Sequence, residues 1–329
     1  REAFWQARQN GKPRHRDIAQ QLHISEGQLI AAHANPDSAP EAIALQALRL
    51  RPDWAELVAA LADVGTVMAL TRNEACVHEK IGLYAPSSQH AGIGIVRGAD
   101  VDLRIFYSQW AHGFAVDDHS GGELQRSLQF FDASGLAMHK VFLKPGSHVA
   151  AFDALLARFA APDQSAGMVV QAAAAAPSHR ADSEVDVAAL QRAWSQLKDS
   201  HDFPALLQAQ QISREQACRL VGQPWARALP QGFARKLFEG AAAQQIPLMI
   251  FTSNTGTVQI HTGPVHKIMC MGPWLNVLDP NFNLHLREDL IASTWLVCKP
   301  SKTGLVHSIE LLDAQGQAIT QIFAAQPND

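Results

Sequence analysis

Apolar and polar residues alternate in several short runs of the chain, which is the pattern of a half-buried β-strand. In residues 101–106 the apolar side chains fall on one face of the predicted strand, and Asp102, Arg104 and Phe106 fall on the other. Further strands are predicted at residues 110–116, 127–131 and 137–143. The turn sequence Asp132-Ala-Ser-Gly135 separates the last two and predicts a hairpin, so the sheets should be mainly antiparallel.

Two other stretches, residues 41–63 and 185–198, carry apolar residues at helical spacing and predict amphipathic helices. In addition, Ser25-Glu-Gly-Gln28 and Ser213-Arg-Glu-Gln216 have the form of a helix capping box, in which both side chains bond backbone amides of the first turn. Each half of the chain should thus open with helices and end with strands. This predicts an α+β fold built twice, each half a large, mainly antiparallel sheet flanked by helices.

The chain contains an internal duplication. Residues 68–142 match residues 249–323 without gaps at a constant offset of 181 positions. Seventeen of the 75 paired positions are identical, whereas average composition gives roughly five by chance. The identical pairs include Thr71/Thr252, Asn73/Asn254, Val77/Val258, Gly82/Gly263, Leu103/Leu284, Val116/Val297, Asp132/Asp313, Gly135/Gly316 and Phe142/Phe323. A second match, slightly shifted, pairs Ser25 with Ser213.

The segment between the two copies, residues 160–186, is rich in Ala, Pro, Ser and Asp and has no apolar periodicity, as expected of a linker. We therefore predict an N-terminal repeat at 1–159, a linker at 160–186 and a C-terminal repeat at 187–329. The length of 329 residues agrees with this division, because it is about twice that of a common single domain.

The composition narrows the class of protein. Hydrophobic residues make up 47% of the chain and charged residues 18%, which indicates a folded protein with a sizeable core. The formal net charge of −4 provides no general basic surface, so neither nucleic acid nor an anionic membrane is an expected partner. No apolar run has the length of a membrane span, and Arg1–Trp5 resembles neither a signal peptide nor a transit peptide. We expect a cytoplasmic protein without stable membrane insertion.

Common catalytic and metal-binding motifs are missing from the sequence. His78-Glu79 lacks the second histidine of a zinc-protease helix, and the glycines between Gly92 and Gly98 have the wrong spacing for a dinucleotide loop. The four cysteines form no Cys-x-x-Cys pair, so reduced and mostly buried thiols are expected. Met269-Cys270-Met271 has soft metal ligands, but core packing is favoured for three such residues on a strand. Fifteen histidines nevertheless justify a search for a metal or metal-cofactor site.

Arg104 and His201 are the two candidate site residues that the sequence indicates, the first because the two copies differ at its position and the second because it precedes a predicted helix. Arg104 pairs with His285 in the duplication, so the two halves differ there in chemistry. By spacing alone Arg104 is either a solvated strand cation or a site residue. His201 lies in a short connection before Pro204, a residue suited to the first turn of a helix. There it is either a polar turn residue or a ligand that points into a cleft.

Many separated motifs, in the same order, resemble the HemS/ChuS haem-utilisation family over nearly the whole chain. In the first half they are Leu70-Thr-Arg-Asn73, Val77-His-Glu79, Asp102-Leu-Arg-Ile-Phe106, Gln109-Trp110, Gln129-Phe-Phe-Asp132 and His139-Lys-Val141. In the second half they are Asp199-Ser-His201-Asp-Phe203, Met249-Ile-Phe251, Val258-Gln-Ile260, Thr262-Gly263, Trp274-Leu-Asn-Val277, Leu284-His-Leu286, Lys299-Pro300 and Ser308-Ile-Glu-Leu311.

The resemblance implies a site for ferric haem (protoporphyrin IX) in a cleft that involves both halves. It implies His201 as the axial ligand of the iron and Arg104 on the distal side, where a cation can hydrogen-bond a ligand of the iron. Phe106 can pack against the porphyrin. Arg214, near a helix start, and Lys299, in a Lys-Pro turn, match the family positions that hold the propionates.

The resemblance also leaves questions open. Where relatives have a tyrosine and an arginine near the propionates, this chain has Phe323 and Gln326, so the strength of propionate binding is left open by the sequence. His78 resembles a residue proposed in some relatives to serve a second haem, and a structural role is equally compatible with its position. Haem importers and haem oxygenases are the implied partners.

Three functions remain open on the sequence. The first is an enzyme that opens the haem ring with an external reductant, for which Arg104 would be the distal catalytic residue. The second is a haem chaperone that stores haem or delivers it to a separate oxygenase. The third is a duplicated protein that binds another flat ligand. Because oxygen chemistry belongs largely to the cofactor, the residues do not separate the first two.

Overall fold

The computed structural model describes residues 1–9, 13–35, 45–120, 122–173, 175, 177–302 and 304–325. The chain forms two compact units. Unit 1 comprises Arg1–Arg72, Glu79–Ala174 and Asn254–Gln259, and unit 2 comprises Asn73–His78, Ala175–Ser253 and Ile260–Asp329. A short strand-turn segment of each half of the sequence therefore belongs to the unit built mainly from the other half.

The elements of unit 1 are helices that precede and follow antiparallel strands. They are α1 (Glu2–Gln9), α2 (His15–Gln21), α3 (Glu26–Ala31), β1 (Leu45–Arg49), α4 (Trp54–Ala60), β2 (Gly65–Arg72), β4 (Ser87–His90), β5 (Ile93–Arg97), β6 (Asp102–Phe106), β7 (His112–Asp118), β8 (Gln125–Phe131), β9 (Ala137–Ser147) and α5 (Val149–Phe159). Two more strands, β3 (Cys76–Gly82) and β12 (Thr257–Gly263), have residues in both units.

Unit 2 repeats this succession of helices and strands. Its elements are α6 (Val187–Ser195), the 3-10 helix η5 (Ser200–Asp202), α7 (Phe203–Gln210), α8 (Arg214–Val221), β10 (Ala226–Leu229), α9 (Phe233–Gln244), β11 (Leu248–Ser253), β13 (Ile268–Met271), β14 (Trp274–Leu278), β15 (Phe282–Arg287), β16 (Ser293–Ser301), β17 (Gly304–Leu312) and β18 (Ala318–Ala324).

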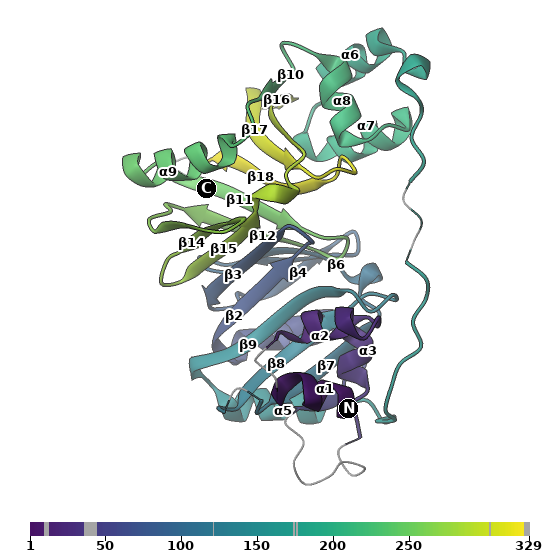
Figure 1. Ribbon diagram of the computed structural model, residues 1–329, viewed down its shortest axis with the longest axis vertical. Coiled ribbons are helices and arrows are strands. Elements are labelled where there is room, and N and C mark those ends of the chain that lie inside the picture. The colour runs from purple at the N-terminus through teal and green to yellow at the C-terminus, as the bar shows by residue number, and fades with distance from the viewer. Residues whose placement is uncertain are drawn as a thin grey trace. The chain divides into compact units, whose positions relative to one another are not determined.

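The strands form two sheets of nine, ordered β1-β7-β8-β9-β2-β3-β15-β14-β13 and β10-β16-β17-β18-β11-β12-β6-β5-β4. Neighbours such as β7/β8, β8/β9, β16/β17 and β17/β18 are antiparallel (Figure 1). The two orders are the same when each strand is replaced by its partner in the duplication. The predicted α+β fold with large antiparallel sheets and flanking helices is confirmed.

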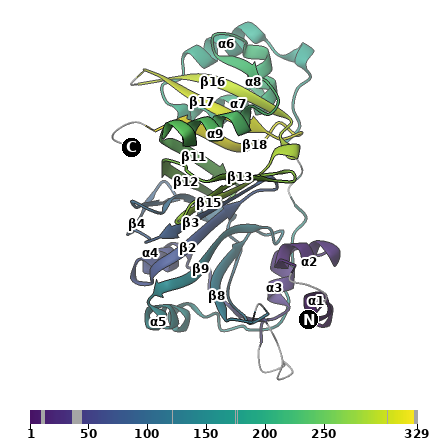
Figure 2. The same ribbon diagram turned by 60° about the vertical axis from the view of Figure 1, so that its left-hand side comes forward.

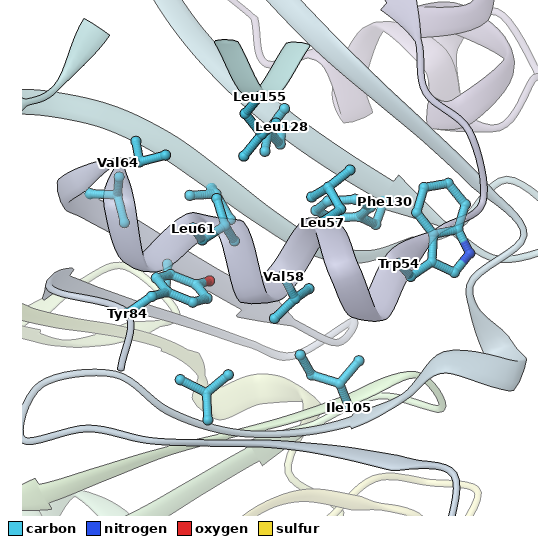
Figure 3. Close-up of a cluster of buried hydrophobic side chains, with 14 of the residues drawn as sticks. Trp54, Leu57, Val58, Leu61, Val64, Tyr84, Ile105, Leu128, Phe130 and Leu155 are labelled. Carbon is cyan, nitrogen blue, oxygen red and sulfur yellow. The ribbon is translucent and has the colours of Figure 1, made fainter. Parts of the chain in front are cut away.

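The main core of unit 1 lies around α4. Trp54 and Leu57 lie beside Phe130 of β8, and Val58 on the other side of the helix faces Ile105 of β6 (Figure 3). These side chains are at most 5% exposed, because the apolar stripe of the helix is covered on two sides. The Trp54 indole N–H still has a partner in the carbonyl of Trp110, at 2.8 Å.

Unit 2 has two clusters of buried apolar side chains. One joins α9, through residues such as Phe238, to β11 and β18, and the helix lies across these strands (Figures 1 and 2). The other joins α6, α7 and α8 to β16, with Trp194 and Phe203 among its largest members. The three helices gather beside β16 and β17 in Figure 1, and they carry the segment around His201.

The structure confirms the predicted strands and corrects three expectations. Residues 45–49, placed in a helix by their leucines, form strand β1 instead, which pairs with β7. Lys299 lies inside β16, opposite Val306, rather than in a turn. Cys270 is exposed, because β13 is the last strand of its sheet and lacks a neighbour on one side, so the predicted core packing is wrong. The cysteines Cys76, Cys218 and Cys298 are free and buried, as predicted.

No helix in the described part of the chain is long and apolar enough to cross a membrane. Described residues of the predicted linker between Ala161 and Ala181 form neither helix nor strand.

Candidate functional site

His201 lies in the short 3-10 helix η5, between α6 and α7. The turn is capped by Asp199, whose Oδ1 accepts a hydrogen bond from the backbone N–H of His201 at 2.9 Å. The same oxygen lies 2.6 Å from Nδ1 of the His201 ring. Pro204 follows in the first turn of α7, as the sequence predicts. The His201 side chain is 89% exposed, so the turn presents an imidazole to its surroundings.

The pairing with Asp199 fixes the chemistry of the ring. The two hydrogen bonds from His201, first the backbone N–H and then the side chain, hold the pKa of Asp199 below its ordinary value. An ionised carboxylate can only accept, so Nδ1 carries the hydrogen of this contact, and in the neutral ring the lone pair is on Nε2. A histidine held by a carboxylate in this way is the usual form of a metal-ligating imidazole.

Arg214 and Lys299 meet at a buried carboxylate, Glu310. Nη1 of Arg214, the first residue of α8, lies 2.7 Å from Glu310 Oε2, and Nζ of Lys299 lies 2.5 Å from Oε1. Glu310 is 0% exposed, Lys299 is 4% exposed in its side chain and Arg214 is 15% exposed. The predicted propionate cations are thus brought together, and each already has an anionic partner.

The charges and the burial of this cluster shift the pKa values of Glu310 and Lys299. Burial alone would raise the pKa of Glu310, but the charges of Arg214 and Lys299, with their hydrogen bonds, outweigh burial and hold that pKa well below its usual range. For Lys299, burial acts against the charged form and lowers the pKa despite the nearby Glu310. When both Arg214 and Lys299 are protonated, two cations share one carboxylate and the cluster carries a net positive charge.

The cluster is joined to His201 through Phe203, the first residue of α7. The Phe203 ring contacts both cations, at 4.4 Å from its centroid to Lys299 Nζ and 5.0 Å to the Arg214 guanidinium carbon. It also packs edge-on against Trp194, with 4.7 Å between the ring centroids. Because Phe203 is two residues after His201 and 1% exposed, these contacts anchor the start of α7 and hold the turn that carries the histidine.

Arg104 and Phe106 lie on β6 in unit 1. Leu103 and Ile105 between and beside them are buried, whereas Asp102, Arg104 and Phe106 are half-buried, so the predicted alternation of faces is confirmed. Nη1 of Arg104 contacts the carboxylate of Asp102 and lies 3.0 Å from the Leu103 carbonyl oxygen. The guanidinium is therefore held along its own strand, with a quarter of the side chain exposed.

Two residues that organise these groups were not among the predicted site residues, although both lie inside motifs quoted for the family. Asp199 could have been found from its spacing, because an Asp two residues before a histidine can cap a turn and bond the ring. Glu310 gave no such signal: a single acidic residue in an alternating strand is most often solvated, and only the fold shows that it is buried beneath two cations.

His78 and Phe323, which the sequence left open as haem-site residues, each pack against a phenylalanine ring. His78 is 0% exposed, and its ring packs edge-on against Phe282 at 5.0 Å between centroids. Phe323 is half-buried and packs edge-on against Phe251 at 5.0 Å. Gln326 lies outside the described residues. Among the residues that the structure describes, no three His, Cys, Asp or Glu side chains are grouped so that they could hold a metal ion.

Comparison with known proteins identifies the family of the chain. The model of the haemin-degrading HemS/ChuX domain matches residues 23–159 and 211–329. The hemin transport proteins HmuS of Yersinia pestis and HemS of Yersinia enterocolitica are each 36% identical over 310 residues, 94% of this chain and 86% of theirs. The chain belongs to the HemS/ChuS family.

Solved structures of the HemS/ChuS family have the same fold. The holo form of PhuS, a heme-binding protein from Pseudomonas aeruginosa, is 42% identical with a TM-score of 0.93, over 99% of this chain and 92% of that one. The heme-degrading enzyme ChuS of Escherichia coli O157:H7 is 31% identical with a TM-score of 0.87, again over 99% and 92%. The relatives thus include proteins named for haem binding, for haemin transport and for haem degradation.

Proposed function

We propose that this chain binds ferric haem in the cytoplasm, with Nε2 of His201 as the axial ligand of the iron, and serves the acquisition of iron from haem. The exposed imidazole carries the proposal, because Asp199 fixes its tautomer and orientation and its free nitrogen faces outward. The names of the relatives support the choice of ligand: PhuS is a heme-binding protein, and HmuS and HemS are hemin transport proteins.

The remaining site residues have roles that fit the same ligand. Phe106, half-buried on β6, would offer an apolar ring for the porphyrin, and Arg104 would offer a cation to hydrogen-bond a ligand of the iron. Of the two predicted propionate contacts, Arg214 has the more exposed side chain. Lys299 acts through the field of its charge, since its ammonium group is buried against Glu310.

Bound haem supplies an iron that changes oxidation state and binds dioxygen. The chain either delivers haem to a separate oxygenase after receiving it from an importer, or holds it during ring opening with an external reductant. Among the relatives, HmuS is named a hemin transport protein and ChuS a heme-degrading enzyme. In both cases His201 would hold the iron through Nε2, and Asp199 would keep the proton on Nδ1.

Titration of the purified chain with hemin tests the ligand. The wild type should show a saturable one-to-one change in the Soret spectrum, and His201→Ala should weaken binding and change the ferric coordination spectrum. His307→Ala is a matched control, because His307 is another exposed histidine of unit 2. Arg104→Ala should mainly change the spectrum of the sixth ligand. A His201→Ala spectrum equal to that of the wild type would refute the axial assignment.

A second measurement separates delivery from degradation. The haem complex is supplied with ascorbate in air, with catalase present to remove free peroxide. Carbon monoxide and a bilin spectrum would support ring opening. An intact haem spectrum, followed by transfer to an added apo-oxygenase, would support delivery.

A further inference from the structure

Unit 1 has a buried tyrosine and a buried histidine that the haem proposal does not use. The Tyr84 hydroxyl oxygen lies 2.6 Å from Nε2 of His139, and Nδ1 on the other side of that ring lies 2.9 Å from the hydroxyl oxygen of Thr71. Tyr84 belongs to the apolar cluster around α4 (Figure 3). All three side chains are at most 3% exposed, so these hydrogen bonds are shielded from solvent.

Burial keeps both partners of the Tyr84–His139 hydrogen bond neutral. It lowers the pKa of His139 to about 3, and it raises the pKa of Tyr84 well above its ordinary value, with a smaller contribution from Tyr107. In the described part of the chain the Tyr84 hydroxyl has no hydrogen-bond partner besides Nε2, and a buried hydroxyl hydrogen without an acceptor is costly. The phenol therefore donates to Nε2, and the Nδ1–H group donates to Thr71.

A row of aromatic rings joins this pair to the surface of unit 1. The Trp110 ring is nearly parallel to that of His139, with 6.1 Å between the centroids and 18° between the planes. Tyr107, which is half-buried, packs edge-on against Trp110 at 5.8 Å. Electrons pass readily between aromatic rings in contact, so an oxidising equivalent that arrives at Tyr107 can reach Tyr84 by way of Trp110 and the His139 ring.

The composition and the duplication set this group of side chains apart. The chain has two tyrosines, and both belong to it. In the second copy the positions of Tyr84, His139, Trp110 and Tyr107 hold Val265, Thr320, Ile291 and Glu288. Unit 2 forms the corresponding strands in the same order without these rings, so the fold itself does not require them.

We propose that Tyr84 and His139 form a redox site, which takes up an oxidising equivalent from a radical oxidant, such as a peroxyl radical, at the surface of unit 1. The oxidant gains one electron, which leaves Tyr84 and passes through Trp110 and Tyr107. At the same time the O–H bond of Tyr84 breaks, and its proton forms an N–H bond with Nε2 of His139. A neutral phenoxyl radical and an imidazolium result.

The proton transfer is favourable although burial disfavours the charged ring, because an oxidised phenol is a far stronger acid than an imidazolium. A one-electron reductant such as ascorbate or a thiol returns the electron, and the proton then goes back from Nε2 to the phenol oxygen. The inference does not depend on haem binding, because none of these side chains is proposed to contact haem and the test uses the chain without haem.

The test oxidises the full chain with photoexcited tris(bipyridine)ruthenium, with a cobalt(III) ammine as electron acceptor, and examines frozen samples by EPR. The wild type should show a phenoxyl radical, and Tyr84→Phe should lose it. Tyr107→Phe should keep the same spectrum in lower yield. Trp110→Phe should also lower the yield, because phenylalanine is far harder to oxidise. Trp295→Phe, at a buried tryptophan of unit 2, is the control and should leave the yield unchanged.

A second measurement needs no variant, so it decides the question even where a substitution in the core prevents folding. Wild-type chain that contains isotopically labelled histidine is oxidised in the same way and examined by electron–nuclear double resonance. The phenoxyl radical should couple to a histidine nitrogen and to one proton that exchanges with deuterium, because Nε2–H of His139 then donates to the phenoxyl oxygen.

Three results would overturn the inference. The first is a wild-type chain that forms no phenoxyl radical. The second is a radical that persists unchanged in Tyr84→Phe, since it would then reside on Tyr107. The third is a phenoxyl radical without coupling to a histidine nitrogen, which would show that His139 does not receive the proton.

Discussion

Each unit has a buried ion pair that starts from the same helix position of the duplicated fold, but the charge at that position has the opposite sign in the two units. In unit 1 the carboxylate is on the helix and the cation on the strand: Glu26 of α3 pairs with Lys140 of β9 at 2.5 Å. In unit 2 the partner of Glu26 is Arg214, and its carboxylate, Glu310, is on β17, at the position that Gln129 has in unit 1. The helix frame is the same in both units, but the charge on the helix is reversed and its partner lies on a different strand.

A second difference in charge lies next to the first, at the positions of Lys299 in unit 2 and Asp118 in unit 1. Lys299, the additional cation of unit 2, pairs in the duplication with Asp118. In unit 1 Asp118 binds His15 Nε2 at 2.9 Å and Arg8 at 3.0 Å. At the spacing that pairs Ser25 with Ser213, His15 corresponds to Phe203, the ring that lies against Lys299. An anion with a histidine in unit 1 has become a cation with an aromatic ring in unit 2.

The difference shows how one copy can specialise without a change of fold. A buried carboxylate in unit 2 holds two basic side chains, which both contact Phe203 at the start of the helix that follows His201. The unit 1 pair of Glu26 and Lys140 is neutral. A ligand that bears carboxylates would gain from the first arrangement and not from the second.

The largest predicted effect comes from removal of the shared carboxylate. Glu310→Gln leaves two buried cations without their partner and should lower the free energy of unfolding by about 3–5 kcal/mol. Glu26→Gln leaves one cation, Lys140, and should cost less. Urea unfolding of both variants and the wild type measures the difference.

The double variant Glu310→Gln/Lys299→Met is the control for this interpretation. It removes one of the two stranded cations, so it should recover part of the loss. Equal losses in Glu310→Gln and Glu26→Gln, or no recovery in the double variant, would mean that the exchange of charges has no energetic consequence.

The pH dependence of stability should show the same asymmetry with a smaller amplitude. The pKa of Glu310 is lower in the folded state, so its contribution is present above the unfolded value of about 4.3 and is lost as the pH falls below it. Between pH 5 and pH 3 this loss amounts to ~2 kcal/mol.

In unit 1, hydrogen bonds from His15 and Ser120 outweigh burial and hold the pKa of Asp118 below its usual range. The pKa of an aspartate in the unfolded state is about 3.9, lower than that of a glutamate. The contribution of Asp118 to the free energy of unfolding should therefore fall by about 1 kcal/mol between pH 5 and pH 3.

Urea unfolding at pH 6, 5, 4 and 3 provides the measurement. Glu310→Gln should lose less stability on acidification than the wild type, and Asp118→Asn should show a smaller version of the same change. Parallel pH profiles for the three proteins would contradict the assignment of acid sensitivity to these carboxylates.

The sequence predicted the frame of both units far better than their charges. Alternation in residues 101–106 and the turn Asp132–Gly135 gave β6 and the β8–β9 hairpin, because both are properties of the local sequence. The helix predicted over 45–49 was wrong because burial in strand β1 follows from its pairing with β7, which no local pattern contains. Cys270 was misplaced for the related reason that an edge position depends on the strand order.

For the candidate site, the sequence identified residues but not their partners. The resemblance selected His201 and Arg214, and the turn before α7 was predicted correctly. The sequence did not predict the role of Glu310, because its burial and its two basic partners come from helix α8 and strand β16. The α8 partner, Arg214, is distant from Glu310 in sequence. Contacts of this kind are tertiary, so they become visible only in the fold.

A smaller effect is expected at the histidine that only unit 2 carries. The position paired with His201 in unit 1 is Pro13, so the first copy has no imidazole there. Asp199→Asn keeps the shape but removes the carboxylate that holds Nδ1, and should weaken hemin binding by roughly tenfold. Hemin titration measures this, with Asp202→Asn as the control at the neighbouring exposed aspartate of η5. An unchanged affinity would show that the carboxylate does not support the ligand.

The smallest effect concerns the feature that the two units share. Ser25 Oγ accepts from the backbone N–H of Gln28 at 3.2 Å, and Ser213 Oγ accepts from that of Gln216 at 3.0 Å, so each caps its helix in the same way. Ser25→Ala and Ser213→Ala should each lower the free energy of unfolding, measured with urea, by about 1 kcal/mol, and the two losses should be nearly equal. Because both caps lie next to the exchanged charges, equal losses would show that charge reversal leaves the local backbone frame intact. A clearly larger loss for Ser213→Ala would show instead that the positive cluster depends on the cap that positions Arg214.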